Sequence, residues 1–165
     1  MDPVTANVLI GRPREEVFDY LADIANHQEF SDHYLKQWRL TRVESAGRGA
    51  GARFKIDAPL DRFGWGDMTF IEVNRPHRIV AAGRSGKFNR NKTWTTWTLE
   101  PKGSNATRVE VSTESEPALV TDKFMEAVTG RRGWWKRGLR KALRRMQSIL
   151  EEDLDRGKRA TVGGL

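Results

Sequence analysis

The apolar positions of the chain follow three successive patterns, which predict a strand with two helices, a run of strands, and a long helix. Residues 4–10 alternate loosely between apolar and polar and are rich in β-branched side chains, as in a strand. Pro13 then suits the first turn of a helix, where its missing N–H costs nothing. From Val17 to Ala25 the apolar residues recur at three- and four-residue spacing, which indicates one buried helix face. A second short helix is expected over residues 26–34.

Between residues 36 and 116 the pattern changes to short alternating runs separated by turns that contain glycine or proline. Residues 53–58 show the alternation most clearly, because Phe54, Ile56 and Ala58 share one face. Such a series predicts antiparallel hairpins with one buried face. The strands are expected over residues 38–43, 53–58, 67–73, 78–84, 93–99 and 107–113.

The last part of the chain returns to helical spacing. A short helix is expected over residues 120–128, and the apolar residues from Trp135 to Leu150 form a single stripe along the next one. Gly138 lies within this stripe and costs about 1 kcal/mol relative to alanine. The stripe nevertheless predicts a long helix that ends near Gly157.

A long helix with one apolar stripe must bury that stripe, and the concave face of a curved sheet is the surface that the predicted elements offer. We therefore expect an α+β fold, in which a curved antiparallel sheet of about six to seven strands grips the C-terminal helix. Two short helices follow the first strand, and a cavity is left between sheet and helix. Residues 1–156 are expected to form a single domain, and residues 157–165 a flexible C-terminal tail.

Composition narrows the class of protein. The chain has 165 residues, which fits one domain, and it lacks cysteine, so disulfides, iron–sulfur clusters and cysteine nucleophiles are excluded. No apolar run reaches about 18 residues, and no basic leader precedes an apolar stretch at the start. Neither a membrane span nor a secretory signal is therefore expected, which favours a cytoplasmic protein.

The net charge of +7 comes from one segment, because residues 131–145 hold eight basic and no acidic side chains. A solvated helix face is the simplest interpretation. Attraction to an anionic membrane surface, helped by Trp134 and Trp135, is an alternative. Specific nucleic-acid binding is not expected, because no base-reading motif is present. The residues assigned to this basic surface are Arg137, Arg140, Lys141, Arg144 and Arg145.

In the order of its elements the sequence resembles the START-like (SRPBCC) helix-grip superfamily, and within it the polyketide cyclase/dehydrase and lipid-transport group. The resemblance begins at residues 8–24, where a strand is followed by a proline-bearing helix start, EEVF, and a closing Leu-x-Asp. It continues with the glycine-rich residues 47–53, with EVNRPHRIV at residues 72–80 and with WTLEP at residues 97–101. Members of this superfamily share a pocket rather than one reaction, so the resemblance implies an apolar cavity and no particular catalytic residue.

Apolar side chains are the best candidates for the cavity wall, because aromatic and methionine side chains line apolar ligand sites. Trp65 and Phe63 occupy a loop flanked by glycines, and we expect Trp65 at the cavity mouth. Asp67 alternates with Ile71, so its carboxyl group either faces the cavity as an acid or base or is solvated at the open end of the sheet. The candidate ligand-binding residues are Phe30, Tyr34, Phe54, Ile56, Trp65, Asp67, Ile71, Trp97, Trp135, Leu139 and Met146.

Metal and cofactor chemistry is not expected. His27 and His33 lie six residues apart, which does not place both on one helix face, and a metal site needs at least three convergent ligands. Both are interpreted as ordinary surface histidines, as is His77 in a turn. No phosphate-binding loop, Ser-His-Asp order or paired-carboxylate motif is present, so no catalytic residue, metal or cofactor is assigned.

The leading prediction is a binding module, a monomer or homodimer that sequesters or carries a small apolar, lipid- or polyketide-like ligand. One alternative is a polyketide cyclase, aromatase or dehydratase that uses Asp67, Tyr34 or Arg84 in the cavity. The other is a membrane-surface protein that docks through the basic helix face.

Overall fold

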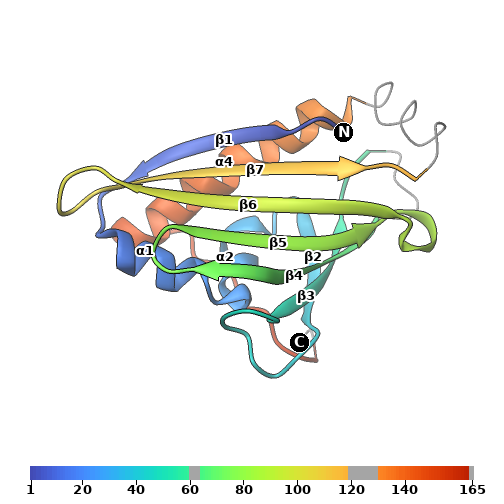
Figure 1. Ribbon diagram of the computed structural model, residues 1–165, viewed down its shortest axis with the longest axis horizontal. Helices are drawn as coiled ribbons and strands as arrows, with labels where there is room; N and C mark the ends of the chain where they lie inside the picture. The colour runs from blue at the N-terminus through green and yellow to red at the C-terminus, as the bar shows by residue number, and fades with distance from the viewer. Residues whose placement is uncertain (60–63, 119–129, 164–165) are drawn as a thin grey trace.

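The chain folds around one curved sheet (Figure 1). A computed structural model describes residues 1–59, 64–118 and 130–163, and within them a seven-stranded antiparallel sheet has the order β1-β7-β6-β5-β4-β3-β2. The six strands from β2 to β7 therefore lie side by side in chain order, each antiparallel to the next. Strand β1 pairs with β7 and forms one edge of the sheet. The strands are β1 Val4–Ile10, β2 Leu35–Leu40, β3 Gly51–Ile56, β4 Trp65–Asn74, β5 Arg78–Ser85, β6 Asn91–Pro101 and β7 Thr107–Glu116.

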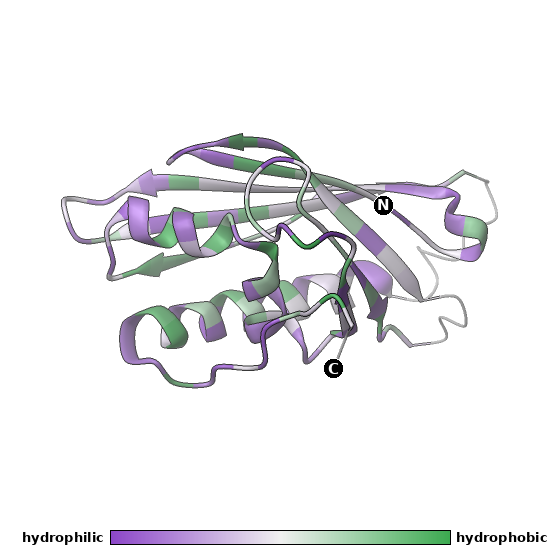
Figure 2. Ribbon diagram, turned by 90° about the horizontal axis from the view of Figure 1, so that it is seen from below, coloured by the Kyte–Doolittle hydropathy of each residue, from purple (hydrophilic) through white to green (hydrophobic). Residues whose placement is uncertain are grey.

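The α-helices lie on one side of this sheet (Figure 2). Helix α4 turns an apolar face toward the sheet and buries Leu139, Ala142, Met146 and Ile149. The predicted α+β helix-grip architecture, with short helices after the first strand, is thus confirmed. The helices are α1 Arg14–Leu21, η1 Ile24–Asn26, α2 His27–Ser31, η2 Lys87–Asn89 and α4 Arg131–Glu152.

Helix α4 begins and ends earlier than its apolar stripe predicts. It starts at Arg131 and ends at Glu152, because Asp153 takes a left-handed conformation with a φ of 56°. Packing explains Gly138 inside the helix, since a Cβ atom there would lie only 2.7 Å from the ring of Tyr34. The short helix expected over residues 120–128 lies outside the described residues.

The chain after α4 is packed against the domain, which corrects the expected flexible tail. The Gly157 N–H donates to the Glu29 carbonyl at 3.0 Å, and the Ala160 N–H donates to the Ala25 carbonyl at 2.9 Å. Ala160 is buried in the core. We call residues 153–161 the C-terminal segment. Hydrogen bonds and ion pairs, rather than an apolar face, attach this segment to the domain. Its sequence therefore shows no apolar period.

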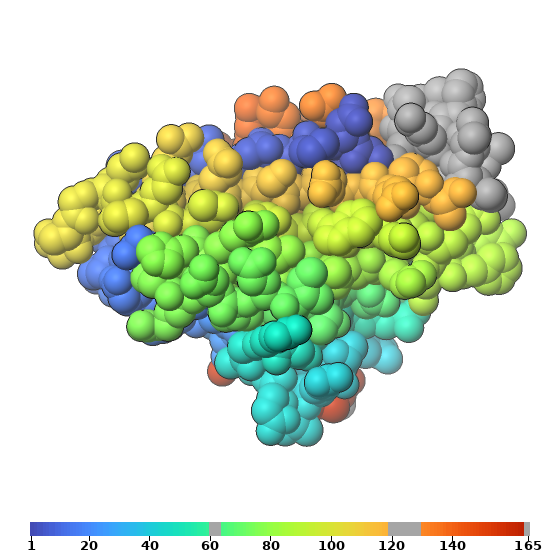
Figure 3. All heavy atoms as spheres, viewed as in Figure 1, coloured from blue at the N-terminus to red at the C-terminus, as the bar shows by residue number. Residues whose placement is uncertain are grey.

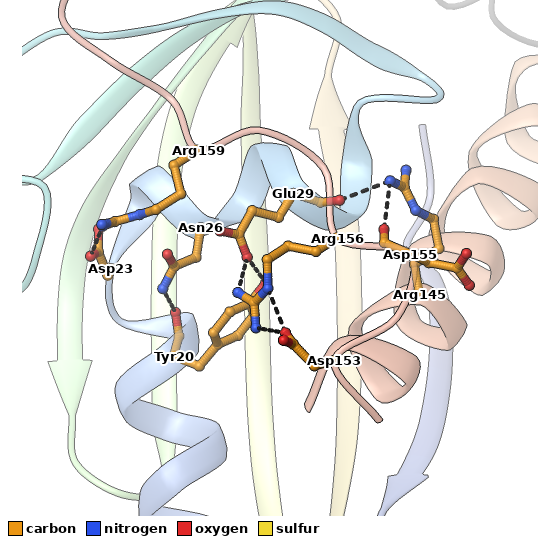
Figure 4. A network of polar contacts seen from close by, with 9 residues as sticks. All are labelled: Tyr20, Asp23, Asn26, Glu29, Arg145, Asp153, Asp155, Arg156 and Arg159. Carbon is orange, nitrogen blue, oxygen red and sulfur yellow. Dashed lines mark hydrogen bonds and ion pairs between the residues drawn. The ribbon is translucent and has the colours of Figure 1, made fainter. Parts of the chain in front are cut away.

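An ionic cluster around the buried Glu29 anchors the C-terminal segment (Figure 4). Glu29 is 2% exposed, and its carboxylate accepts hydrogen bonds from the Tyr20 hydroxyl at 2.8 Å and from the Arg156 guanidinium at 2.7 Å. Arg156 also pairs with Asp153 at 2.9 Å. Burial and the Glu29 carboxylate both raise the pKa of Tyr20, so its hydroxyl stays a donor. The buried charge of Glu29 is therefore paired and hydrogen-bonded, which buried charges require.

Arg145 makes a second link between α4, α2 and the C-terminal segment. Its guanidinium pairs with the Asp32 carboxylate and donates to the carbonyls of Glu29 at 2.9 Å and Asp155 at 3.1 Å. It is half-buried, so its assignment to the basic surface is wrong. The helical period places Arg145 at the border of the apolar stripe, beside Met146, and from there it reaches inward.

Candidate functional site: a cavity between the sheet and helix α4

A cavity lies between the concave face of the sheet and the helices α2 and α4. Its volume is about 730 Å³ with the opening to solvent included, and the centres of water molecules can occupy about 60 Å³ of it. On the opposite face of the sheet, the side chains of β5, β6 and β7 form a continuous outer surface (Figure 3). The space for a ligand is therefore on the helix side of the sheet.

Most of the residues predicted for the cavity wall do line it. Their side chains come from α2, from strands across the sheet and from α4, which are far apart in the sequence and are brought together by the fold. Their aromatic rings make the wall largely apolar. These residues are Phe30, Tyr34, Phe54, Ile56, Asp67, Trp97, Trp135 and Leu139.

Ile71 is not on this wall, and its predicted orientation is wrong. Strand β4 turns Phe70 inward with 1% exposure, so Ile71 is on the outer face with 45% exposure. The pairing of β4 with β5 also shifts its register between Phe70 and Glu72. The pairing is regular from Gly66 to Phe70, so simple alternation already places Ile71 opposite Phe70, and the prediction assigned the wrong face of β4 to the cavity.

Trp65 and Met146 are also placed elsewhere. The Arg53 guanidinium carbon lies 5.4 Å from the centroid of the Trp65 ring, so this side chain packs on the neighbouring strand β3 instead of the cavity wall. Met146 is fully buried in the core, where the apolar stripe of α4 meets the sheet. Phe63 lies outside the described residues.

His27 lines the cavity and was missed by the sequence analysis. It is 2% exposed, so its interpretation as a surface histidine is wrong, whereas His77 is exposed as predicted. The signal that could have found it is its spacing. His27 follows Ile24 by three residues and precedes Phe30 by three, which places it on the apolar side of the second helical region.

The His27 ring lies in an aromatic cage. Its centroid is 5.0 Å from Trp97, 5.2 Å from Phe30, 5.6 Å from Phe70 and 6.5 Å from Trp38. Burial among these rings lowers the pKa of His27 to about 4, against the opposing hydrogen bond to the Leu21 carbonyl. The imidazole is therefore neutral at pH 7.

Tyr34 supports the part of the cavity beside the start of α4. Its ring packs edge-on against Trp134 and Trp135, with centroids 5.7 Å from each, and it also lies against Gly138. Burial raises the pKa of the Tyr34 hydroxyl, which stays protonated.

Two pairs of polar residues on the wall are engaged with one another. Asp67 accepts a hydrogen bond at 2.9 Å from the backbone N–H of Arg84, whose side chain is exposed. On the facing strands the hydroxyls of Thr95 and Thr113 lie 3.1 Å apart. Asp67 and Arg84 are thus at the solvent-facing rim.

The basic surface of α4 is separate from the cavity. Arg137, Arg140, Lys141 and Arg144 are exposed. No group of three or more metal-binding side chains occurs within the described parts of the chain. None of the helices described is both long and apolar enough to cross a membrane.

A curved antiparallel sheet that holds a long C-terminal helix over an apolar cavity defines a START-like, helix-grip protein. The chain belongs to the polyketide cyclase/dehydrase and lipid transport family, whose model matches residues 1–151. No curated protein matches the sequence.

Solved structures share the fold at low sequence identity. The KanY protein superposes with a TM-score of 0.72 at 17% identity, over 90% of this chain and 97% of its own. A truncated norcoclaurine synthase from Thalictrum flavum gives 0.66 at 14% identity, over 92% and 94%. DynU16, from the dynemicin biosynthetic locus, gives 0.61 at 19% identity, over 95% of this chain and 50% of its own.

Proposed function

We propose that this protein binds a small hydrophobic ligand, lipid- or polyketide-like, in the cavity between the sheet and α4. The observation that carries the proposal is the cavity itself, about 730 Å³ with its opening and lined by aromatic side chains. A cavity wall that is largely apolar, with a few polar groups, suits a small hydrophobic molecule. The family to which the chain belongs includes lipid-transport proteins, which agrees with a carrier. The cytoplasmic location expected from the sequence is part of the same proposal.

Binding is the better supported function because the acid or base expected in the cavity is engaged. The Asp67 carboxylate accepts a hydrogen bond from the Arg84 backbone N–H at the rim of the cavity. A cyclase needs a base within hydrogen-bond reach of the reacting carbon's proton. This observation favours a carrier over a cyclase that uses Asp67 as its base.

The test is calorimetric titration with 2-naphthol, a bicyclic aromatic probe. Trp135→Ala removes a ring of the wall and is expected to weaken binding about tenfold. Trp65→Ala is the matched control, because this tryptophan packs outside the cavity, and its affinity should equal that of the wild type. Absence of saturable binding to the wild type, or equal losses in both variants, would contradict the proposal.

A further inference from the structure

One ring nitrogen of His27 is committed to the protein. Nε2 lies 2.8 Å from the Leu21 carbonyl oxygen. A carbonyl oxygen only accepts hydrogen bonds, so Nε2 must carry the hydrogen. In a neutral imidazole the other nitrogen, Nδ1, then has no hydrogen and presents a lone pair.

The lone pair on Nδ1 is open. Nδ1 has no hydrogen-bond partner among the described residues. Among the described residues, the side-chain polar atom that is both unpartnered and fully enclosed is Arg14 Nε. His27 Nδ1 is unpartnered but does not belong to this group, so it keeps some accessible surface. Because His27 lines the cavity and the whole residue is only 2% exposed, we take the accessible surface of Nδ1 to face the cavity.

We propose that His27 Nδ1 is a recognition group that accepts a hydrogen bond from a hydroxyl or N–H of the ligand. The ligand class is therefore an apolar molecule with a neutral donor on its buried end, such as a phenol or an enol. This inference rests on the proposed function and adds the chemistry of the ligand to it. A pure hydrocarbon would leave the lone pair unpaired in an aromatic cage, which is costly.

Tyr34 offers a second open group on the same wall. Its hydroxyl has no hydrogen-bond partner in the described chain and is not fully enclosed. A tyrosine hydroxyl can donate or accept, so it suits either a carbonyl or a hydroxyl of the ligand. Unlike His27, it does not require a donor.

The charge of the site selects a neutral ligand end. A lone pair on a neutral imidazole repels a phenolate or carboxylate oxygen, and burial in the aromatic cage keeps the ring neutral. Among the described residues that line the cavity, the cationic side chain is that of Arg84, which is exposed at the rim.

The experiment compares two probes that differ by one hydrogen-bond donor, 2-naphthol and 2-methoxynaphthalene. Calorimetry should give the wild type a preference of roughly tenfold or more for 2-naphthol, since a buried acceptor left unpaired weakens binding. His27→Phe keeps an aromatic ring in the cage and removes the acceptor, so it should bind both probes equally. Tyr34→Phe is the matched variant and should keep the preference.

The outcomes separate this inference from the proposed function. If neither probe binds the wild type, the proposed function fails and the inference fails with it. If both bind with equal affinity, the cavity is a ligand site but His27 is not its recognition group. A preference lost in Tyr34→Phe and kept in His27→Phe would assign the recognition to Tyr34 and overturn the proposal.

A measurement on the wild type alone covers the case in which His27→Phe does not fold. The ¹⁵N resonance of an unprotonated imidazole nitrogen moves when that nitrogen accepts a hydrogen bond. We expect 2-naphthol to move the Nδ1 resonance of His27 and 2-methoxynaphthalene to leave it nearly in place. Equal shifts with the two probes would contradict the proposal.

Discussion

Two of the buried polar side chains of helix α2, those of His27 and Glu29, have different environments. Glu29 has its carboxylate bonded to Tyr20 and Arg156, whereas His27 has one nitrogen bonded to a backbone carbonyl and the other open to the cavity. The two residues lie two positions apart and have the same 2% exposure. Burial alone therefore does not tell a structural polar group from a functional one.

The difference lies in what remains unpaired after the protein has made its own contacts. A buried polar group that is fully bonded stabilises one arrangement of the chain, as Glu29 does for the C-terminal segment. A buried group that still has an unsatisfied hydrogen-bond acceptor or donor can form that hydrogen bond with a ligand. Helix α2 thus anchors the fold on one side and presents a recognition group on the other.

The largest expected effect comes from breaking the Glu29 contact. Arg156→Ala leaves the Glu29 carboxylate buried with Tyr20 as its hydrogen-bond donor, which should lower the free energy of unfolding by about 2–4 kcal/mol. Urea unfolding measures this change. Arg140→Ala, on the exposed face of α4, is the control and should change stability by less than about 0.5 kcal/mol.

A second variant identifies the cause of that loss. If the penalty is the unpaired charge, then Glu29→Gln added to Arg156→Ala should restore part of the stability, because the buried group is no longer ionised. Loss of stability in Arg156→Ala without any recovery in the double variant would show that packing of the C-terminal segment, and not charge pairing, is what matters.

The next effect is the pH dependence that His27 contributes. Its folded pKa of about 4 is below the ordinary 6.5, so the unfolded chain binds the proton first as pH falls. The stability from burying the neutral ring is present above pH 6.5 and is lost as pH falls toward 4. Between pH 7 and pH 5 the loss amounts to about 2 kcal/mol.

Urea unfolding of the wild type and His27→Phe at pH 7, 6 and 5 checks this. The variant should show a flatter profile over that range. Burial also lowers the pKa of His33, so His33→Gln is the control and should flatten the profile less. Identical profiles for the wild type and His27→Phe would exclude His27 as the titrating group.

The sequence predicted the parts of the site that depend on local order. Phe54 and Ile56 were placed correctly because they alternate within one regular strand. Ile71 was misplaced because alternation in β4 does not tell which of its two faces is buried, and Phe70 rather than Ile71 turns inward. Trp135 was predicted correctly because the apolar stripe of a helix can be recognised from the sequence of that helix alone.

Contacts between distant residues explain the remaining differences. Glu29 and Arg156 are 127 positions apart, so nothing near either residue shows that the C-terminal segment is anchored. His27 was missed because its apolar surroundings come from β2, β4 and β6 as well as from α2. In each case a polar residue was judged from its own type, while its role depends on its partners.

The smallest effect is expected on the basic surface. Two neighbouring arginines of α4 differ much as Glu29 and His27 do, because one is bonded to several other residues of the protein and the other is open to solvent. Arg144 is exposed, whereas Arg145 is bound to Asp32 and to carbonyls of α2 and the C-terminal segment. Changing Arg137, Arg140, Lys141 and Arg144 together to glutamine should leave the 2-naphthol affinity within about twofold and the urea midpoint nearly unchanged. Arg145→Gln alone should lower that midpoint, because it removes the link to α2. If the variant with these four substitutions weakens 2-naphthol binding as much as Trp135→Ala does, the outer face of α4 and the cavity do not work independently.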